Sequence, residues 1–443
     1  MPSGLREGTP SGMTTSMETD RLKQALSGRE GTTALEALYG VRAVDRQRSR
    51  YLGLVGRFES TFSKASGALL FSAPGRTEIC GNHTDHNGGR VLAAAVAQDA
   101  VAVAAPTSDA VISIESEGYP RQSVSADDPA PRESERATTA ALIRGVAARM
   151  RALGHAVGGF CACVASDVGK GSGLSSSAAY EVLIGTILNH LYNGGAIDGL
   201  QVAMIAQYSE NEYFGKPCGL MDQTTSALGG FVTIDFRDPA RPQVRGVRSE
   251  FGGSGFVPVI VDTGGSHADL TDDYAAVKEE MKAVAQCLGG SVLRDVTRER
   301  VLEELPRLRA QVGDRAVLRA LHFFADDERV ARQVEALEAG QYRRFLQLVR
   351  ESGLSSWTLL QNCYSTRAVT EQGVPLALAL SQDLLGDEGA CRVHGGGFAG
   401  TILAFVPEGR QGSYLEGVRR VFGPDSCHPL SIRSAGAVRL PVG

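Results

Sequence analysis

The chain of 443 residues carries 45 Lys and Arg against 50 Asp and Glu, a net charge of −5, and 43% of its residues are hydrophobic. This length and apolar content predict two domains with cores of their own. The nearly balanced charge excludes the basic footprint of a nucleic-acid-binding protein, and no apolar run reaches the length that crosses a bilayer. We therefore expect neither nucleic acid nor membrane as a partner, and a monomer in solution.

Residues 1–20 are rich in Ser, Thr, Gly and Pro and lack the apolar core of a signal peptide. The sequence therefore predicts a cytoplasmic protein with a disordered N-terminal tail over 1–20. The eight cysteines form no paired Cys-x-x-Cys set. Scattered cysteines in apolar surroundings indicate buried reduced thiols rather than zinc ligands or disulfides.

The spacing of apolar residues and turn formers predicts the elements of the first part of the chain. They are helices over 22–39 and 46–62, strands over 68–73, 91–105 and 111–115, a helix over 134–153 capped by Ser134, and a strand over 159–165. The first of these strands is expected to stop at Pro74-Gly75. The next two are expected to belong to an antiparallel sheet.

A glycine-rich loop follows, with the sequence Asp167-Val168-Gly169-Lys170-Gly171-Ser172-Gly173-Leu174-Ser175-Ser176-Ser177-Ala178-Ala179. Alternate glycines let the backbone approach a ligand, and the hydroxyl run opens a helix expected over 176–192. Unpaired N–H groups and the positive end of the helix dipole favour phosphate oxygens there. The spacing fits neither a Walker loop nor the dinucleotide fingerprint, so a different phosphate cradle is expected. The alternative is a Gly/Ser turn in which Ser175 only caps the helix.

A domain boundary is predicted between Asp238-Pro239 and the glycine cluster at 252–255, which gives domains over 21–248 and 249–443. The remaining expected elements are a helix over 198–214 that ends at Gly215, strands over 231–236 and 256–262, a helix over 272–288, amphipathic helices to about residue 385, a strand over 401–406, a helix over 415–422 and a strand over 437–440. Strands mixed with segregated helices indicate an α+β fold rather than a doubly wound parallel sheet.

Three stretches resemble the superfamily of galactokinase, homoserine kinase, mevalonate kinase and phosphomevalonate kinase, the GHMP kinases. The glycine-rich loop is similar to the second motif of that family from Gly171 onward, with Gly169 where the family usually has Pro. Residues 73–89, Ala-Pro-Gly-Arg-Thr-Glu-Ile-Cys-Gly-Asn-His-Thr-Asp-His-Asn-Gly-Gly, are similar to the galactokinase signature, and 393–400, Val-His-Gly-Gly-Gly-Phe-Ala-Gly, to the third motif. The resemblance implies two α+β domains, an active site in the cleft between them, and the use of ATP and Mg²⁺.

Phosphoryl transfer asks a protein mainly for positioning and for positive charge around the transferred group. The resemblance implies that Asp222 is the base facing the anomeric hydroxyl of a sugar and that Arg76 steadies the developing charge. Ser177 and Glu210 match the positions that hold Mg²⁺, which prefers hard oxygen ligands. From residue type alone, Asp222 is equally an N-cap for a helix over 223–228. The alternative for Arg76 is a surface arginine in a turn, and that for Glu210 is a solvated helix residue.

The resemblance assigns two further groups of residues. Those expected at the nucleotide are Gly171, Ser172, Gly173, Leu174, Ser175, Ser176 and Ser177. Those expected at the sugar are Asn82, His83, Thr84, Asp85 and Tyr274. From residue type alone, Asp85 either accepts from vicinal hydroxyls or forms an Asx turn before Asn87-Gly88-Gly89. We expect His394 and Trp357 to be packing residues.

The sugar shell departs from the galactokinase pattern. Galactokinases carry Val-Asn-Leu-Ile-Gly-Glu after the arginine, where this chain has Thr77-Glu78-Ile79-Cys80-Gly81-Asn82, and a Tyr of the family is replaced by His86. We expect phosphorylation of the anomeric hydroxyl of a hexose, D-galactose to α-D-galactose 1-phosphate. One alternative is a 1-kinase for a sugar such as galacturonate, because Asn82 does not repel a carboxylate. The other is a non-catalytic galactokinase-like sensor of sugar and ATP, against which the complete Ser-Ser-Ser-Ala loop argues.

Overall fold

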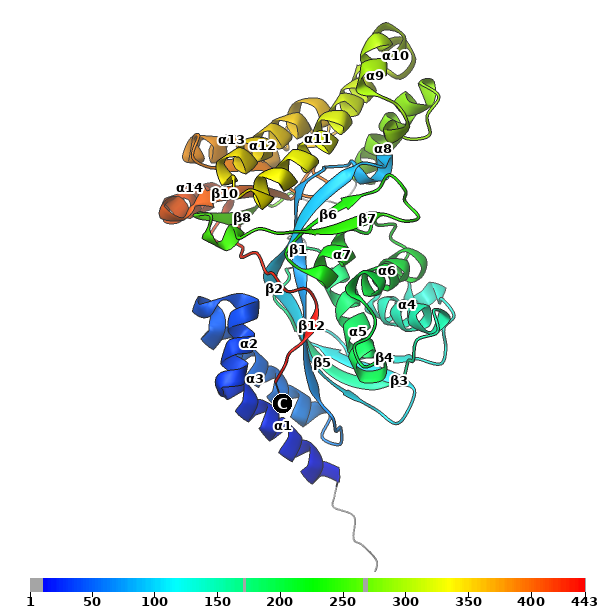
Figure 1. The fold of residues 1–443 in the computed structure, drawn as a ribbon, viewed down its shortest axis with the longest axis vertical. Helices are drawn as coiled ribbons and strands as arrows, with labels where there is room; N and C mark the ends of the chain where they lie inside the picture. The colour runs from blue at the N-terminus through cyan, green and yellow to red at the C-terminus, as the bar shows by residue number, and fades with distance from the viewer. Residues whose placement is uncertain (1–10, 170–172, 266–269, 443) are drawn as a thin grey trace, which may run out of the picture.

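The computed structural model describes residues 11–169, 173–265 and 270–442, and they form a mixed α+β structure with two lobes (Figure 1). The N-terminal lobe is built on an eight-stranded sheet and the C-terminal lobe on a four-stranded sheet, counted over these residues. Within them, no helix combines the length and the apolar character needed to cross a membrane. The α+β architecture is the one that the sequence predicts.

The larger sheet has the order β12-β1-β2-β5-β3-β4, with β6 paired to β2 and β7 to β6. Its strands are β1 (Leu69–Cys80), β2 (Arg90–Pro106), β3 (Val111–Ser116), β4 (Gln122–Ser125), β5 (Phe160–Ser166), β6 (Phe231–Asp235), β7 (Gln243–Val247) and β12 (Val438–Arg439). Neighbouring strands are antiparallel except β3 and β5, which are parallel. The first half of the long strand β2 pairs with β6 and the second half with β5, so β2 spans both parts of the sheet.

Strand β1 continues through Pro74-Gly75, where the sequence predicts its end. Pro74 lies opposite Asp99, and the register with β2 shifts between Pro74 and Arg76. Such an irregularity accommodates a residue that has no N–H to donate. The strand therefore carries Arg76, where a turn was expected.

Helices cover both faces of the larger sheet (Figure 1). One face packs on α4 (Thr139–Ala152), α5 (Ser176–Tyr192), α6 (Gly199–Ser209) and α7 (Met221–Leu228), and the other on α1 (Ser11–Ser27), α2 (Arg29–Tyr39) and α3 (Val44–Thr61). Along β2, Ala102 and Ala104 face the first layer, whereas Val101, Val103 and Ala105 face the second. This alternation is the two-residue period of a strand buried on both faces.

Three expectations about the helices are wrong. Helix α1 begins at Ser11, inside the expected tail, and Leu22 and Leu26 are buried on its inner face; residues 1–10 lie outside the described residues. The expected helix over 22–39 is two helices. Helix α1 ends at Ser27, where the N–H of Gly28 donates to the carbonyl of Gln24 in its last turn. The cap of α4 is the hydroxyl of Thr138, which accepts from the N–H of Ala141, instead of Ser134.

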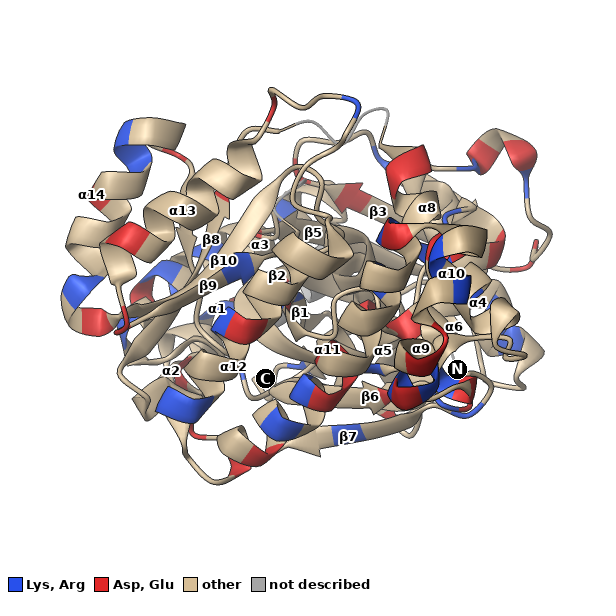
Figure 2. Ribbon diagram, turned by 90° about the horizontal axis from the view of Figure 1, so that it is seen from above, with Lys and Arg blue, Asp and Glu red and all other residues tan. Residues whose placement is uncertain are grey.

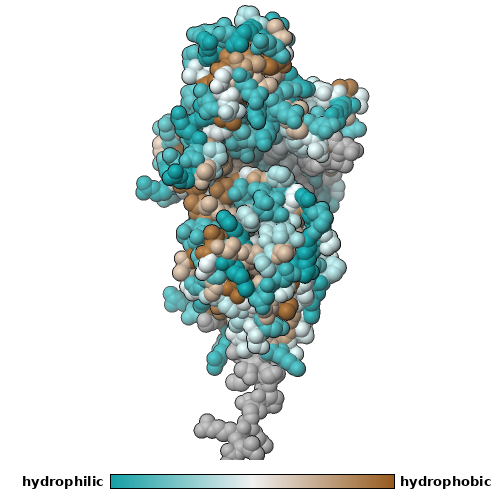
Figure 3. Space-filling view, turned by 90° about the vertical axis from the view of Figure 1, so that its right-hand side faces the viewer, coloured by the Kyte–Doolittle hydropathy of each residue, from teal (hydrophilic) through white to brown (hydrophobic). Residues whose placement is uncertain are grey.

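The C-terminal lobe has the strand order β11-β8-β10-β9. Its strands are β8 (Phe256–Asp262), β9 (Ala390–Val393), β10 (Thr401–Pro407) and β11 (Cys427–Pro429), and its helices are α8 (Thr271–Cys287), α9 (Arg298–Glu303), α10 (Leu305–Val312), α11 (Asp314–Glu338), α12 (Tyr342–Ser355), α13 (Gly373–Leu385) and α14 (Gln411–Phe422). Figure 2 shows Lys and Arg interspersed with Asp and Glu over the helices in view. Figure 3 shows a mostly hydrophilic face on which apolar residues gather at mid-height.

The end of the chain leaves the C-terminal lobe and returns to the larger sheet. Ile432 bridges to Val96 of β2, and the short strand β12 pairs with β1 (Figure 1). Leu440 and Val442 are buried in the core beneath α1–α3. The last residues of the expected domain 249–443 therefore complete the N-terminal lobe.

A buried carboxylate fixes this return. Asp99 of β2 is fully buried and accepts hydrogen bonds from the Tyr39 hydroxyl at 2.5 Å, Arg50 at 2.7 Å and Arg433 at 3.0 Å, and from the hydroxyl of Ser72. These donors come from the N-terminal helices, from β1 and from the returning segment. Because a buried charge is costly unless it is paired, all three must be in place together.

We expect Leu440→Ala to lower the free energy of unfolding by about 2–4 kcal/mol, because it removes a buried side chain of the core beneath α1–α3. Leu376→Ala, on an exposed face of α13, is the matched control and should change it by less than about 0.5 kcal/mol. Thermal and denaturant unfolding of the two variants measures the difference. Equal losses would contradict the packing of the returning segment.

Candidate functional site

Arg76 and Asp222 form a two-pronged ion pair at the centre of the site. Arg76 Nε donates to Asp222 Oδ1 at 2.7 Å, and Arg76 Nη2 donates to Oδ2 at 2.6 Å. The side chain of Asp222 is 23% exposed and that of Arg76 is 12% exposed. A fork of this kind fixes the plane of the carboxylate as well as its charge. The pair joins β1 to the first turn of α7.

Neither Asp222 nor Ser175 caps a helix with its side chain. Helix α7 begins at Met221 with Leu220 at its N-cap, so Asp222 lies inside the first turn. Ser175 occupies the N-cap position of α5 in a left-handed conformation, φ 59°, and its side chain makes no capping bond. Its hydroxyl instead donates to Asp222 Oδ2 at 2.6 Å. The interpretation of Ser175 as a simple cap is therefore wrong.

The glycine-rich loop is held against β1. The backbone N–H of Arg76 donates to the carbonyl of Leu174 at 3.0 Å, and Arg76 Nη1 donates to the carbonyl of Gly173. A Cβ added at Gly75 would lie 2.8 Å from the Leu174 oxygen, so only glycine permits this approach.

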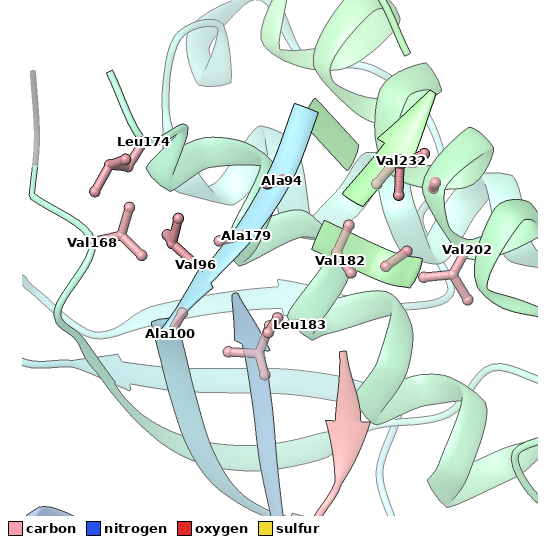
Figure 4. Packing of buried hydrophobic residues seen from close by; sticks show 14 of the residues in the cluster. Ala94, Val96, Ala100, Val168, Leu174, Ala179, Val182, Leu183, Val202 and Val232 are labelled. Carbon is pink, nitrogen blue, oxygen red and sulfur yellow. The ribbon is translucent and has the colours of Figure 1, made fainter. Parts of the chain in front are cut away.

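Apolar side chains anchor the two ends of the loop. Val168 and Leu174 are buried in the core of the N-terminal lobe, and Figure 4 shows both beside Val96. Residues 170–172 lie outside the described residues, and with them the predicted nucleotide residues Gly171 and Ser172. The structure thus places the predicted nucleotide residues from Gly173 onward.

Ser177 and Glu210, the two residues expected to hold Mg²⁺, lie side by side. Ser177 Oγ donates to Glu210 Oε1 at 2.9 Å, and the exposed Lys216 reaches the same oxygen at 3.4 Å. Glu210 is only 2% exposed and begins a turn of π-helix over Glu210–Phe214 that continues α6. Such turns re-aim side chains and are frequent at functional sites.

Sequence reasoning missed a second buried carboxylate beside this pair. Glu181 lies one turn after Ser177 on α5 and is fully buried. The amide of Gln223 donates to Glu210 Oε2 at 2.7 Å and to Glu181 Oε2 at 3.3 Å. Burial, with the nearby charge of Glu210, raises the pKa of Glu181 well above its usual value. The four-residue spacing from Ser177 is the one signal in the sequence for it.

The donor set fits a hard divalent cation. Ser177 and Glu210 present oxygen atoms side by side, and among the described residues Glu181 Oε1 and Gln223 Oε1 have no hydrogen-bond partner. Hard oxygen donors are what Mg²⁺ prefers.

A cavity of about 650 Å³ opens beside the hydroxyl run. Ser176 and Ser177 line one part of it, and Tyr119, Tyr180 and Phe214 supply aromatic surface. This combination of aromatic walls and a helix N-terminus suits a planar base that carries phosphates. A cavity of about 740 Å³ lies elsewhere, beside α2, and none of the described signature residues lines it.

Asp85, one of the predicted sugar residues, lies close enough to Asp222 for the two charges to interact. Its Oδ2 lies against Gly219, where a Cβ would come within 2.9 Å. Burial raises the pKa of Asp85; the charge of Asp222 adds to this effect and His83 opposes it. Thr84 is buried, and its hydroxyl donates to backbone carbonyls of Gly81 and Arg90. In this arrangement the hydroxyl of Thr84 has no hydrogen left to donate to a sugar.

Asn82 is 1% exposed and bonded at both ends of its amide. Its Nδ2 donates to Glu78 Oε1 at 3.0 Å and to the carbonyl of Gly395 at 2.7 Å, while its Oδ1 accepts from Asn362 at 2.7 Å. Glu78 in turn pairs with the buried Arg392 at 2.9 Å. Direct contact between Asn82 and a sugar therefore stays a prediction and requires the Gly395 segment to move.

The backbone carbonyls of the glycine segment at 395–397 accept hydrogen bonds from the sugar signature and from Tyr274. His83 Nε2 donates to the carbonyl of Gly396 at 2.9 Å, and the hydroxyl of Tyr274 donates to that of Gly397 at 3.0 Å. His86 contacts His83 at 3.4 Å, and burial, His83 and Lys278 lower the pKa of His86 to about 3. His86 is therefore uncharged near neutral pH.

His394 is a packing residue, as expected. It is 3% exposed and bonds to Thr77 at 3.0 Å and to Thr401 at 3.1 Å. Burial and the charges of Arg76 and Arg392 hold the pKa of His394 well below its usual value.

Two family models match the chain. Residues 56–106 match the galactokinase galactose-binding signature, and residues 141–230 match the GHMP kinases N-terminal domain. The chain carries the galactokinase sugar signature on a GHMP kinase fold. The first match contains Arg76 and the loop to Asp85, and the second contains the glycine-rich loop, Glu210 and Asp222.

Solved structures agree with this fold. The galactokinase of Lactococcus lactis, crystallised with galactose, superposes with a TM-score of 0.72 at 21% identity and covers 87% of this chain and 98% of its own. The mevalonate kinase of Methanococcus jannaschii gives 0.58 at 14% identity, over 83% and 99%. The D-glycero-D-manno-heptose 1-phosphate kinase of Bacteriodes thetaiotaomicron gives 0.56 at 16% identity, over 83% and 97%. The two-lobed GHMP kinase fold expected from the motifs is confirmed.

We expect Ser177→Ala and Ser175→Ala to change different properties, the Mg²⁺ requirement in the first and kcat in the second. Ser177→Ala should raise the Mg²⁺ concentration needed for half-maximal activity, because it removes an oxygen beside Glu210. Ser175→Ala should leave that concentration unchanged and lower kcat about threefold to tenfold, because it frees one oxygen of Asp222. Mg²⁺ titrations of both variants at saturating sugar test this. An unchanged Mg²⁺ requirement in both would contradict the assignment of Ser177.

Proposed function

We propose that this GHMP kinase-like chain transfers the γ-phosphoryl group of ATP to the anomeric hydroxyl of D-galactose. The observation that carries the proposal is the Arg76–Asp222 fork, which is tied to Ser175 of the glycine-rich loop and whose carboxylate interacts with the charge of Asp85 in the sugar signature. A base, a cation and a phosphate cradle are the parts that phosphoryl transfer requires.

In the proposed reaction Asp222 accepts the proton of the sugar hydroxyl as the oxygen attacks phosphorus. Arg76 fixes the plane of the Asp222 carboxylate and offsets the negative charge that spreads over the transferred group. Ser177 and Glu210 would hold Mg²⁺, with Glu181 and Gln223 behind them. When bound, the ion supplies positive charge to the phosphate oxygens.

The cavity of about 650 Å³ is proposed as the nucleotide site, because its hydroxyl end, Ser176 and Ser177, adjoins the phosphate loop. The proposed domains are 21–248 and 249–443, with the returning segment 431–442 packed on the first of them.

The charges beside Asn82 favour a neutral sugar over a uronic acid. A C6 carboxylate placed near Asn82 would meet Glu78, whose oxygen lies 3.0 Å from the Asn82 amide and whose charge is already paired with Arg392. Like charges in a desolvated site disfavour binding, so galacturonate is the weaker candidate. A sensor without catalysis is disfavoured because Asp222, Arg76 and the hydroxyl run are assembled.

We expect a panel of sugars in an ADP-release assay to give the highest kcat/KM with D-galactose.

We expect Asp222→Asn to lower kcat by about 10²–10⁴ while galactose and ADP still bind. The amide keeps the shape and a hydrogen-bond acceptor for Arg76 but cannot take a proton. Activity within a few-fold of wild type would remove Asp222 from the mechanism. A wild-type protein that binds galactose and ATP without turnover would support the sensor.

A second test concerns the exchanged positions of Glu and Asn. Galactokinases have Asn and Glu where this chain has Glu78 and Asn82, and here the two side chains are bonded to each other. Asn82→Glu alone should lower the melting temperature and galactose use, because it places two carboxylates together in a buried site. The double variant Glu78→Asn with Asn82→Glu should recover part of both losses, since it again leaves one carboxylate and one amide and the bond between positions 78 and 82 forms in reverse. No recovery would show that the two positions do not act as a pair.

A further inference from the structure

The loop that carries the sugar signature is held at both ends by one helix of the other lobe. The loop runs from Gly81 to Arg90, between β1 and β2, and contains His83 and Asp85. Two successive carboxylates of α11, Asp326 and Asp327, reach its two ends.

Asp326 holds the start of the loop. Its Oδ2 accepts the backbone N–H of Gly81 at 3.2 Å and that of Asn82 at 3.1 Å, and its Oδ1 accepts from Arg329 at 2.8 Å. The side chain is fully buried, and His322 and Arg329 outweigh burial to hold the pKa of Asp326 below its usual value. His322 of the same helix adds a third bond, because its Nε2 donates to the carbonyl of Asn82 at 3.0 Å.

Asp327 holds the end of the loop. Its Oδ1 accepts the backbone N–H of Arg90 at 2.7 Å, while its Oδ2 accepts from the side chains of Arg90 at 2.9 Å and Arg294 at 2.5 Å. Asp235 of β6 contacts the same two guanidinium groups, each at 3.0 Å. The two carboxylates thus share their cations, but the loop N–H is bonded to Asp327 and not to Asp235.

We propose that Asp326 and Asp327 are positioning residues for the sugar: from the C-terminal lobe they fix both ends of the loop at 81–90, so that sugar affinity depends on α11. The proposal rests on the proposed sugar-kinase function. The described part of the phosphate loop is held separately, by Arg76 and by Val168 and Leu174 in the core, so nucleotide affinity should not depend on these two carboxylates.

The test compares Asp327→Ala, Asp327→Asn and Asp235→Ala. Asp327 is 13% exposed and therefore a safer site for substitution than the fully buried Asp326. Asp327→Ala should weaken galactose binding about tenfold, because it removes a charge-assisted bond to the loop backbone. Asp327→Asn keeps an acceptor for the Arg90 N–H and should weaken it less than about threefold, as should Asp235→Ala, which disturbs only the shared guanidinium groups. Calorimetry with galactose and with ADP measures both affinities.

Unchanged ADP affinity in all three variants is expected and shows that they are folded. Equal galactose affinities for Asp327→Ala and Asp235→Ala would overturn the proposal, as would a parallel loss of ADP affinity. A sugar-independent measurement is amide hydrogen exchange of the peptide at 81–90 without ligand. Exchange should be faster in Asp327→Ala than in Asp235→Ala, and identical exchange would overturn the proposal. If the wild type binds no sugar, the proposed function fails, and the exchange result still decides the role of Asp327.

Discussion

One guanidinium group, that of Arg76, joins the parts of the site. Two of its nitrogens hold Asp222, the third donates to Gly173, and its backbone N–H binds Leu174. A strand, a helix and the phosphate loop are therefore brought together by one residue. Because Arg stays charged and presents a rigid planar fork, it sets the distances among these parts in a way that Lys could not. The irregularity of β1 at Pro74 and Gly75 exists next to this residue and lets the loop approach the strand.

The buried carboxylate of Asp99 plays the corresponding part for the N-terminal lobe. Arg50 of α3 bonds to Asp99 at 2.7 Å and also pairs with Asp167 at 3.2 Å, and the N–H of Asp167 donates to the carbonyl of Asp99 at 2.9 Å. The approach to the phosphate loop is thus tied to the N-terminal helices. Residues of α3 thus contact the approach to the glycine-rich loop, and residues of α11 contact both ends of the segment at 81–90.

Local patterns in the sequence predicted the elements that depend on local patterns. The bounds of α5 and β8 agree with the expected 176–192 and 256–262, because a helical apolar face and a continuous apolar run are visible without knowing their partners. The sequence motifs also assigned Ser177 and Glu210 to one metal site, and the two side chains lie within hydrogen-bond distance of each other.

Other features depend on partners far along the chain. Strand β1 passes Pro74 because β2 supplies a shifted register, and α1 packs on a core that Leu440 and Val442 complete from the far end of the chain. Glu181 and Asp327 have no motif of their own, and their importance comes from the atoms that the fold places beside them. A single sequence shows which residues can react, but it does not show which residues hold them in place.

The return of the chain end to the larger sheet has a consequence for synthesis. The N-terminal lobe emerges from the ribosome first. At that point it lacks β12, the apolar cover of Leu440 and the Arg433 charge that pairs with the buried Asp99. A buried carboxylate that has only one of its two cations and an open sheet edge are costly, so the nascent lobe stays incompletely packed while some 200 residues of the other lobe are made. The lobe that holds the phosphate loop is thus the first to be translated and among the last parts of the protein to be finished.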